Sequence, residues 1–168
     1  HFISNCAHSQ VADAENYLFR SQPGKFAIFD WTRDFVELPF IPSSIIGHAG
    51  KVFCFSTNQL AIVNPENLFI EDVIEGVGCI NSKTSLVCDA GLVFADYRNI
   101  YLANPAIKPI GSTILNVPDD GWLNLSFAEK RDVRCGYDSK RKAFLFFYTR
   151  GTNYRCWAYS FQNRRWDL

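Results

Sequence analysis

The chain has 168 residues, of which 48% are hydrophobic and 20% are charged, and its formal net charge is zero. This length and composition are typical of one globular domain. No apolar run approaches the roughly 20 residues that a helix needs to cross a bilayer, so the sequence predicts no membrane-spanning segment.

A polar N-terminal stretch comes first, within which Val11–Asn16 predicts a short helix. The first predicted unit covers residues 14–47 and contains three expected strands: Tyr17–Arg20, Lys25–Trp31 and Phe35–Phe40. Between the first two, Gln22-Pro-Gly24 predicts a turn, because Pro fixes φ and Gly permits a positive φ.

The second predicted unit covers residues 48–80 and the third covers residues 81–115. Their expected strands are Lys51–Ser56, Gln59–Asn64, Leu68–Ile74, Thr84–Asp89, Leu92–Asp96 and Ile100–Ala103. Ala90-Gly91 and Arg98-Asn99 have the spacing of hairpin turns.

Residues 116–129 read as an irregular loop, with one helical turn near Leu123–Glu129. The fourth predicted unit, residues 130–168, contains three expected strands: Asp132–Tyr137, Lys142–Tyr148 and Tyr154–Phe161. The residues between these strands are charged or carry Gly and Asn, as turns require.

A strand motif recurs along the chain. Phe26–Glu37 aligns without a gap on Leu60–Glu71, and Ile100–Pro105 repeats the first half of the pattern. Each copy is an apolar strand, then Asp or Asn, then a turn. Short strands repeating at such intervals predict an all-β fold, a β-propeller-like array of three to four antiparallel blades within a single β-repeat domain, residues 1–168. The even strand spacing also fits a β-sandwich.

The zero net charge conceals an asymmetry. Residues 1–129 carry 7 basic and 14 acidic side chains, whereas residues 130–168 carry 10 basic and 3 acidic ones. Such a division suggests electrostatic docking between subunits or a face that meets nucleic acid, although solvated loops could also collect these charges. The candidate subunit or partner interface consists of Lys140, Arg141, Lys142, Arg164, Arg165 and Trp166, since Arg and Trp are common in interface hot spots.

Motifs for catalysis or for cofactor binding were not found. None of the three histidines lies in a setting typical of a nucleophile and its base, and no metal, phosphate or dinucleotide motif occurs. Adjacent acids such as Glu71-Asp72 could bind calcium or act in glycoside hydrolysis, but such pairs are usually solvated. The six cysteines contain no C-x-x-C pair and are interpreted as buried thiols. The sequence predicts no enzyme and no cofactor.

Two segments have a recognisable order of turns and strands. The first is Gly78–Tyr101, continuing to Lys108-Pro-Ile-Gly-Ser-Thr-Ile114, in which a Ser-rich turn, a Val-Phe strand and an Ile-Tyr strand precede a Pro-Ile-Gly close. The second is Val133–Tyr148 with Trp157–Trp166. The first segment resembles a sequence common in tail proteins of short-tailed bacteriophages, and the second is similar to the blade ending of the same proteins. Kelch-type propellers end their blades in a related way.

The resemblance implies a tail nozzle or hub, a β-propeller protein assembled as a ring through which DNA leaves the virion. The expected partners are copies of itself, neighbouring tail or adaptor proteins, and DNA that passes without sequence recognition. The expected location is the virion tail. Such proteins are several hundred residues long, and this chain has no Met, so we expect a fragment of a longer protein.

The acidic excess in residues 1–129 suggests that Glu71 and Asp72 contribute to an acidic lumen along which DNA slides. The alternative function is a kelch-like propeller module that recognises a protein or a glycan. A glycan-cleaving propeller is a third possibility, which requires two carboxylates about 5–10 Å apart.

Overall fold

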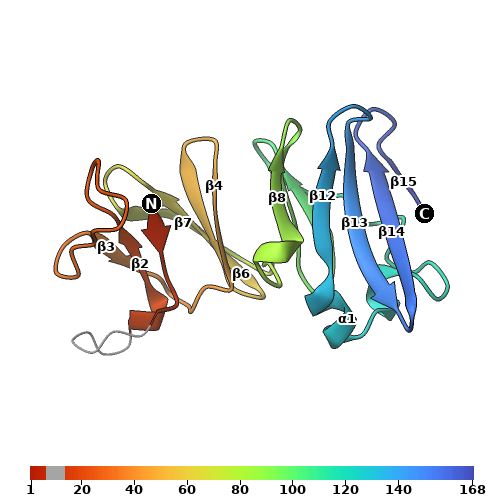
Figure 1. Ribbon diagram of the computed structural model, residues 1–168, viewed down its shortest axis with the longest axis horizontal. Helices are drawn as coiled ribbons and strands as arrows, with labels where there is room; N and C mark the ends of the chain where they lie inside the picture. The colour runs from red at the N-terminus through yellow and green to blue at the C-terminus, as the bar shows by residue number, and fades with distance from the viewer. Residues whose placement is uncertain (7–13) are drawn as a thin grey trace. The chain divides into compact units, whose positions relative to one another are not determined.

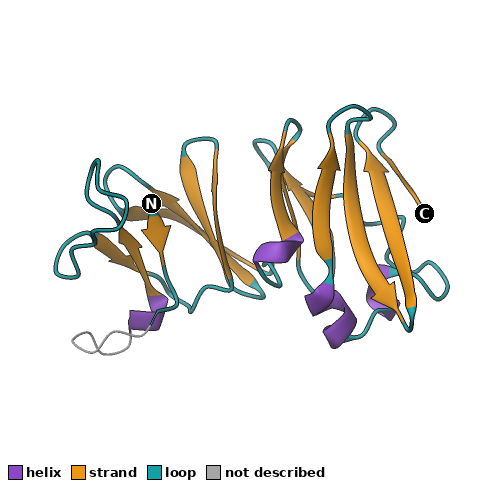
Figure 2. Cartoon of the chain, in the orientation of Figure 1, coloured by secondary structure: helices purple, strands orange, loops and turns teal. Residues whose placement is uncertain are grey.

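The computed structural model describes residues 1–6 and 14–168 and shows an all-β protein (Figure 1). Strands make up 46% and helices 9% of the described residues, which confirms the predicted all-β class. In the part of the chain that the structure describes, helices are limited to short segments between strands (Figure 2). The described residues form four antiparallel sheets, none of which closes on itself.

The chain divides into two compact units, His1–Gly78 and Cys79–Leu168. The first unit holds a three-stranded and a four-stranded sheet. Its strands are β1 (Phe2–Ile3), β2 (Tyr17–Arg20), β3 (Phe35–Glu37), β4 (Ser44–His48), β5 (Lys51–Phe55), β6 (Gln59–Asn64) and β7 (Phe69–Glu75). The 3-10 helix η1 (Ala14–Asn16) is the end of the predicted helix at 11–16, whose residues 11–13 lie outside the described residues.

The second unit holds two four-stranded sheets. Its strands are β8 (Ser85–Cys88), β9 (Gly91–Ala95), β10 (Ile100–Ala103), β11 (Ile107–Pro109), β12 (Arg134–Asp138), β13 (Ala143–Arg150), β14 (Asn153–Ser160) and β15 (Arg165–Asp167). Short helical segments precede or join the sheets: η2 (Ser82–Thr84), η3 (Trp122–Asn124) and α1 (Phe127–Asp132). The last two lie at the predicted helical turn.

All four sheets are meanders. Their strand orders are β1-β2-β3, β4-β5-β6-β7, β8-β9-β10-β11 and β12-β13-β14-β15, so each strand pairs with its neighbours in the sequence. In the four-stranded sheets the turns are short, because antiparallel neighbours need only a few connecting residues. Sheets of this kind keep most backbone pairing local.

The predicted strand at Lys25–Trp31 is wrong. In this segment a turn at Pro23-Gly24 leads to a single bridge between Ser21 and Phe29, and no strand forms. Phe26 is 72% exposed and Ile28 is 48% exposed. Their apolar pattern resembles that of β6, but no neighbouring strand covers these side chains, and strand pairing is decided by such neighbours.

The boundary between the first two predicted units also differs. Ser44–Gly47 was assigned to the end of the first unit, whereas the structure places Ser44–His48 in β4, the first strand of the next sheet. β4 pairs with β5 from Ser44 opposite Phe55 to His48 opposite Lys51. Ala49 and Gly50 form the tight hairpin turn that joins β4 to β5, and both have positive φ, as such a two-residue turn requires.

Each unit has its own hydrophobic core. In the first unit the core includes Leu18 and Leu38 together with Val52 and Val63 of β5 and β6. In the second unit the inward faces of both sheets meet, and the buried side chains are Val93, Ile100, Phe144, Phe146, Trp157, Tyr159 and Trp166, with Trp122 and Leu125 from the connecting segment. This core positions the polar cluster described below.

Candidate functional site

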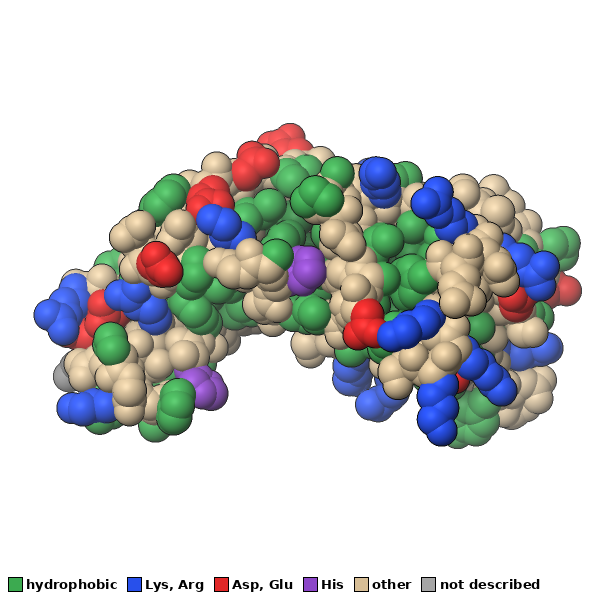
Figure 3. Space-filling view, turned by 90° about the horizontal axis from the view of Figure 1, so that it is seen from above, with side chains coloured by type: hydrophobic (Ala, Val, Ile, Leu, Met, Phe, Trp, Pro, Cys, Tyr) green, Lys and Arg blue, Asp and Glu red, His purple; other side chains and the backbone are tan. Residues whose placement is uncertain are grey.

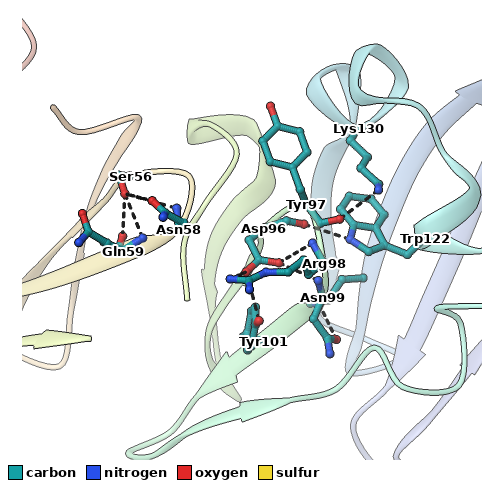
Figure 4. Close-up of polar contacts among 11 residues, drawn as sticks. Ser56, Asn58, Gln59, Asp96, Tyr97, Arg98, Asn99, Tyr101, Trp122 and Lys130 are labelled. Carbon is teal, nitrogen blue, oxygen red and sulfur yellow. Dashed lines mark hydrogen bonds and ion pairs between the residues drawn. The ribbon is translucent and has the colours of Figure 1, made fainter. Parts of the chain in front are cut away.

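A buried polar cluster surrounds Asp96, at the turn between β9 and β10 (Figure 4). Asp96 is only 1% exposed. Its Oδ1 accepts hydrogen bonds from the backbone amides of Arg98 and Asn99, both at 2.7 Å. Its Oδ2 accepts one from the hydroxyl of Tyr101 at 3.1 Å. This Asx turn supplies local donors to a carboxylate that is removed from water.

Trp122 and Lys130 complete the cluster from the segment that joins the two sheets. The indole Nε1 of Trp122 donates to the carbonyl oxygen of Asp96 at 3.0 Å, and Nζ of Lys130 donates to that of Tyr97 at 3.0 Å. Lys130 lies 5.4 Å from the centre of the Trp122 ring. Burial lowers the pKa of Lys130, and the charge of Asp96 opposes that shift. The negative charge of Asp96 therefore stabilises the positive charge of Lys130 inside the unit.

The chemistry of this cluster favours a structural role. Burial, with a further contribution from the charge of Asp96, raises the pKa of Tyr101 to about 12. The Tyr101 hydroxyl therefore stays protonated at neutral pH and acts as a donor to Asp96. Because these polar groups are bonded to one another, the cluster fixes the β9–β10 turn to the connecting segment and to α1.

The first unit contains the same turn between β5 and β6 (Figure 4). Oγ of Ser56 accepts hydrogen bonds from the amides of Asn58 at 3.3 Å and Gln59 at 2.9 Å. The amide of Ser56 donates to the carbonyl of Gln59 at 2.9 Å, as the amide of Asp96 donates to Asn99 at 3.0 Å. Ser and Asp thus have the same role at matching positions of two sheets.

A glycine follows the last strand of each of these two sheets and packs on the turn. A Cβ on Gly78 would lie 2.3 Å from the carbonyl carbon of Thr57. A Cβ on Gly111 would lie 2.6 Å from Oδ1 of Asn99. Neither position accepts a side chain without a shift of its neighbours. Sequence reasoning missed this repeated pair of turn and glycine, because its members are distant along the chain and share no strand pattern.

The predicted basic residues lie in two turns of the β12–β15 sheet. Lys140, Arg141 and Lys142 belong to the β12–β13 turn, and Arg164 and Arg165 lie at the β14–β15 turn and the start of β15. All five are exposed. In Figure 3, Lys and Arg side chains gather over the right-hand part of the view, which is the second unit.

Several of these basic side chains have acidic partners. Lys142 forms an ion pair with Asp89, whose carboxylate also accepts a hydrogen bond from Tyr137 at 3.3 Å. The hydrogen bond from Lys142 lowers the pKa of Asp89. Arg165 lies 2.8 Å from Asp167. These local pairs reduce the positive potential that the two turns present to solvent.

Trp166 does not lie on that basic surface. It is 9% exposed, it packs against Tyr159 with ring centres 5.1 Å apart, and its Nε1 donates to the carbonyl of Ile110 at 2.6 Å. The indole thus ties β15 to the chain that follows β11. In this structure Trp166 belongs to the core of the second unit.

Glu71 and Asp72 are exposed on β7, the last strand of its sheet. Glu71 pairs with Lys51 and accepts a hydrogen bond from Asn64 at 2.9 Å. The hydrogen bonds from Lys51 and Asn64 lower the pKa of Glu71. Neighbours on the same sheet therefore partly neutralise this carboxylate.

Within residues 1–6 and 14–168, no group of three or more His, Cys, Asp or Glu could hold a metal ion. All six cysteines are free thiols, and Cys54 and Cys79 are buried. No helix among the described residues is long and apolar enough to cross a membrane. No protein-family model matches the sequence, and a search of curated proteins finds no match.

Proposed function

We propose that this chain is a structural component of a virion, a tail nozzle or hub protein whose propeller-like blades assemble as a ring around the path of the DNA. The strand order supports the propeller: each sheet is an antiparallel meander in chain order, and three of the four have four strands. This is the pattern of a propeller blade. A β-sandwich typically has Greek-key connections instead.

The contacts within the second unit give further support. Between its two sheets, the most extensive strand contact joins β8 and β12, which are the first strands of their sheets. Blades radiate from a central axis, so neighbouring blades converge at their inner strands. The first strands β8 and β12 are then the inner strands of their blades, and the last strands β11 and β15 are the rim strands. By the same strand order, β4 would be the inner strand of its own blade and β7 the rim strand.

This assignment changes the role proposed for Glu71 and Asp72. Both lie on β7, where most side chains are exposed. On a rim strand they are available to a neighbouring protein and do not line the axis of the propeller. We therefore assign them to the outer acidic surface of the first unit.

The charges of the two units suit assembly. Residues 1–78 carry 4 basic and 9 acidic side chains, and residues 79–168 carry 13 basic and 8 acidic ones, which gives net charges of −5 and +5. Opposite net charges on the two units favour contacts between the first unit of one copy and the second unit of another. Neighbouring tail or adaptor proteins would bind the same ring, and DNA would pass without sequence recognition.

The function is tested by imaging. An antibody raised against the β12–β13 turn would be used to isolate the particle that contains this chain from its native source, for negative-stain microscopy and mass measurement. A ring or tail-shaped assembly of fixed stoichiometry is the expected result. A free monomer, or a particle that contains no nucleic acid at any stage of its assembly, would overturn the virion proposal.

One observation favours the alternative, a kelch-like binding module. A groove of about 530 Å³ lies in the first unit beside the β4–β5 hairpin, lined by Phe2, Ile45, His48, Lys51 and Pro65. Such apolar grooves with a few polar groups are typical ligand sites. Saturable binding of a glycan or peptide to the monomer, abolished by Ile45→Glu, would favour this function over the virion proposal.

A further inference from the structure

The sheet β12–β15 buries one face and leaves the other uncovered. Side chains alternate along its strands: Phe144, Phe146 and Trp157 point into the core of the second unit. The register pairs Phe147 with Arg134 and Cys156, and Leu145 with Gly136 and Ala158, so these residues share the opposite face.

The centre of the uncovered face is apolar, and exposed charged side chains, Arg134 and Asp167, lie on its outer strands. Phe147 is 44% exposed, and Leu145, Cys156 and Ala158 are half-buried. Phe147 lies over Gly136, where a Cβ would be 3.2 Å from its ring. Contiguous apolar rows of this kind on a surface indicate a protein interface. β13 is apolar on both faces, as expected of a strand that is covered on both sides in the assembled state.

A complementary surface lies on the sheet β1–β3 of the first unit. Leu18 of this sheet points into the core of that unit, whereas Tyr17, Phe19 and Phe35 lie on the other face. Phe19 is fully buried there and packs on Trp31 with ring centres 4.4 Å apart, and Tyr17 and Phe35 are half-buried beside it. Their rings stack with centres 4.9 Å apart. Glu37 pairs with Tyr17 across the strands and is exposed. This face is therefore aromatic and acidic at its edge.

We propose that the uncovered face of β12–β15 binds the Tyr17 and Phe35 face of a second copy of this chain. Charge selects the occupant, because Arg134 borders the first face and Glu37 the second, within units of net charge +5 and −5. This inference rests on the proposed ring and names its contact. A head-to-tail contact of this type is heterologous, so repetition closes a ring or extends a filament.

Two variants that each block one face test the contact. Phe147→Glu places a carboxylate in the apolar row, and Tyr17→Lys removes a ring from the Tyr17 and Phe35 stack and places a cation beside Glu37, whose charge it offsets. Each change is expected to weaken self-association at least about tenfold, as truncation of an interface hot spot does. Each variant alone should sediment as a monomer where the wild type forms larger species. An equimolar mixture retains one intact contact and should form a dimer that does not grow.

Phe69→Glu is the matched control, since Phe69 is 47% exposed on β7 and lies on neither face. It should assemble like the wild type. The mixed dimer also shows that both blocked variants are folded. If both single variants still form larger species, the proposed contact is wrong, although the proposal of a ring still stands. A wild type that stays monomeric would overturn the choice of a second copy, whereas the virion proposal is judged separately from the isolated particle.

Discussion

The indole nitrogen of Trp122 donates a hydrogen bond to the carbonyl oxygen of Asp96 at 3.0 Å, and the Asp96 carboxylate is held by its own turn. The side chain of Trp122, in the connecting segment, is thus hydrogen-bonded to the β9–β10 hairpin turn. Because Lys130 also binds this turn through Tyr97, the connecting segment and the turn form one cooperative structure.

Asp96→Ala should strongly destabilise the protein. The change leaves two amides and the Tyr101 hydroxyl without an acceptor and leaves Lys130 as a buried charge, so we expect a loss of about 3 kcal/mol in unfolding free energy. Asp96→Asn keeps an acceptor oxygen and should lose less. Ser56→Ala, at the matching but more exposed turn, should lose about 1 kcal/mol. Urea unfolding measures all three, and equal losses for Asp96→Ala and Ser56→Ala would contradict this ranking.

Gly78→Ala tests the close approach of a glycine to the β5–β6 turn. Its Cβ would lie 2.3 Å from the backbone carbonyl carbon of Thr57. The turn would have to shift to accept it, so we expect the free energy of unfolding to fall by about 3 kcal/mol. Gly47→Ala is the control, because its nearest neighbour would be 4.0 Å away. That variant should be unchanged or slightly more stable, since Ala loses less entropy than Gly on folding. Similar thermal midpoints for the two variants would refute the steric argument.

The sequence predicted the strands where apolar alternation is bounded by turn residues. β2, β6 and β10 were predicted with their observed bounds, and β13 was predicted within about two residues. Of the Asp and Asn residues in the recurring motif, Asn64 ends a strand and accepts amides two and three residues ahead. Asp96 and Asp138 make the same turn outside the motif. These features depend on neighbouring residues only, which a sequence displays.

Features set by distant partners were missed. Lys25–Trp31 has a strand pattern but no partner strand to cover it. The loop 116–129 appeared irregular, yet the indoles of Trp122 and Trp157 bond it to both sheets, at the carbonyls of Asp96 and Asp120. Trp166 was expected at an interface because Trp is common there, but its burial is decided by Tyr159 and Ile110.

Arg164→Gly should stabilise the β14–β15 turn. Arg164 has φ of 52°, in the left-handed region, as do Leu68 and Lys142 at the ends of two related turns. Gly adopts this conformation without steric cost, so we expect a gain of about 0.5–1 kcal/mol. Arg165→Gly, one residue later within β15, should be destabilising. Urea unfolding measures the change. A loss of stability in Arg164→Gly would show that contacts of the Arg164 side chain stabilise the fold by more than its left-handed backbone conformation destabilises it.

The stability conferred by Glu129 should depend on pH. Its carboxylate accepts hydrogen bonds from the Ser126 amide at 2.7 Å and from Arg150 at 3.1 Å. The Ser126 amide and, to a lesser extent, Arg150 hold the pKa of Glu129 below its ordinary value of 4.5. A depressed carboxyl pKa stabilises the fold above that ordinary value, and the contribution is lost as the pH falls through the folded-state pKa.

Glu129→Gln should therefore be less stable than the wild type by about 1 kcal/mol at neutral pH, the usual contribution of a helix cap. The difference should shrink as the pH falls below 4.5. Unfolding curves across the acid range check this. A difference that stays constant with pH would mean that the charge of Glu129 is not involved.

Charge reversal on β7 separates a rim position from a lumen position. If Glu71 and Asp72 lined the DNA path, Glu71→Lys with Asp72→Lys would add cations that bind phosphates and slow genome release. On the rim, the same change should leave ejection unchanged. Glu71→Lys also breaks the pairs with Lys51 and Asn64, so we expect a small loss of stability, because exposed ion pairs contribute little. The measurement is the rate of DNA ejection from particles that carry the double variant. A slower rate at low salt would indicate that Glu71 and Asp72 line the DNA path.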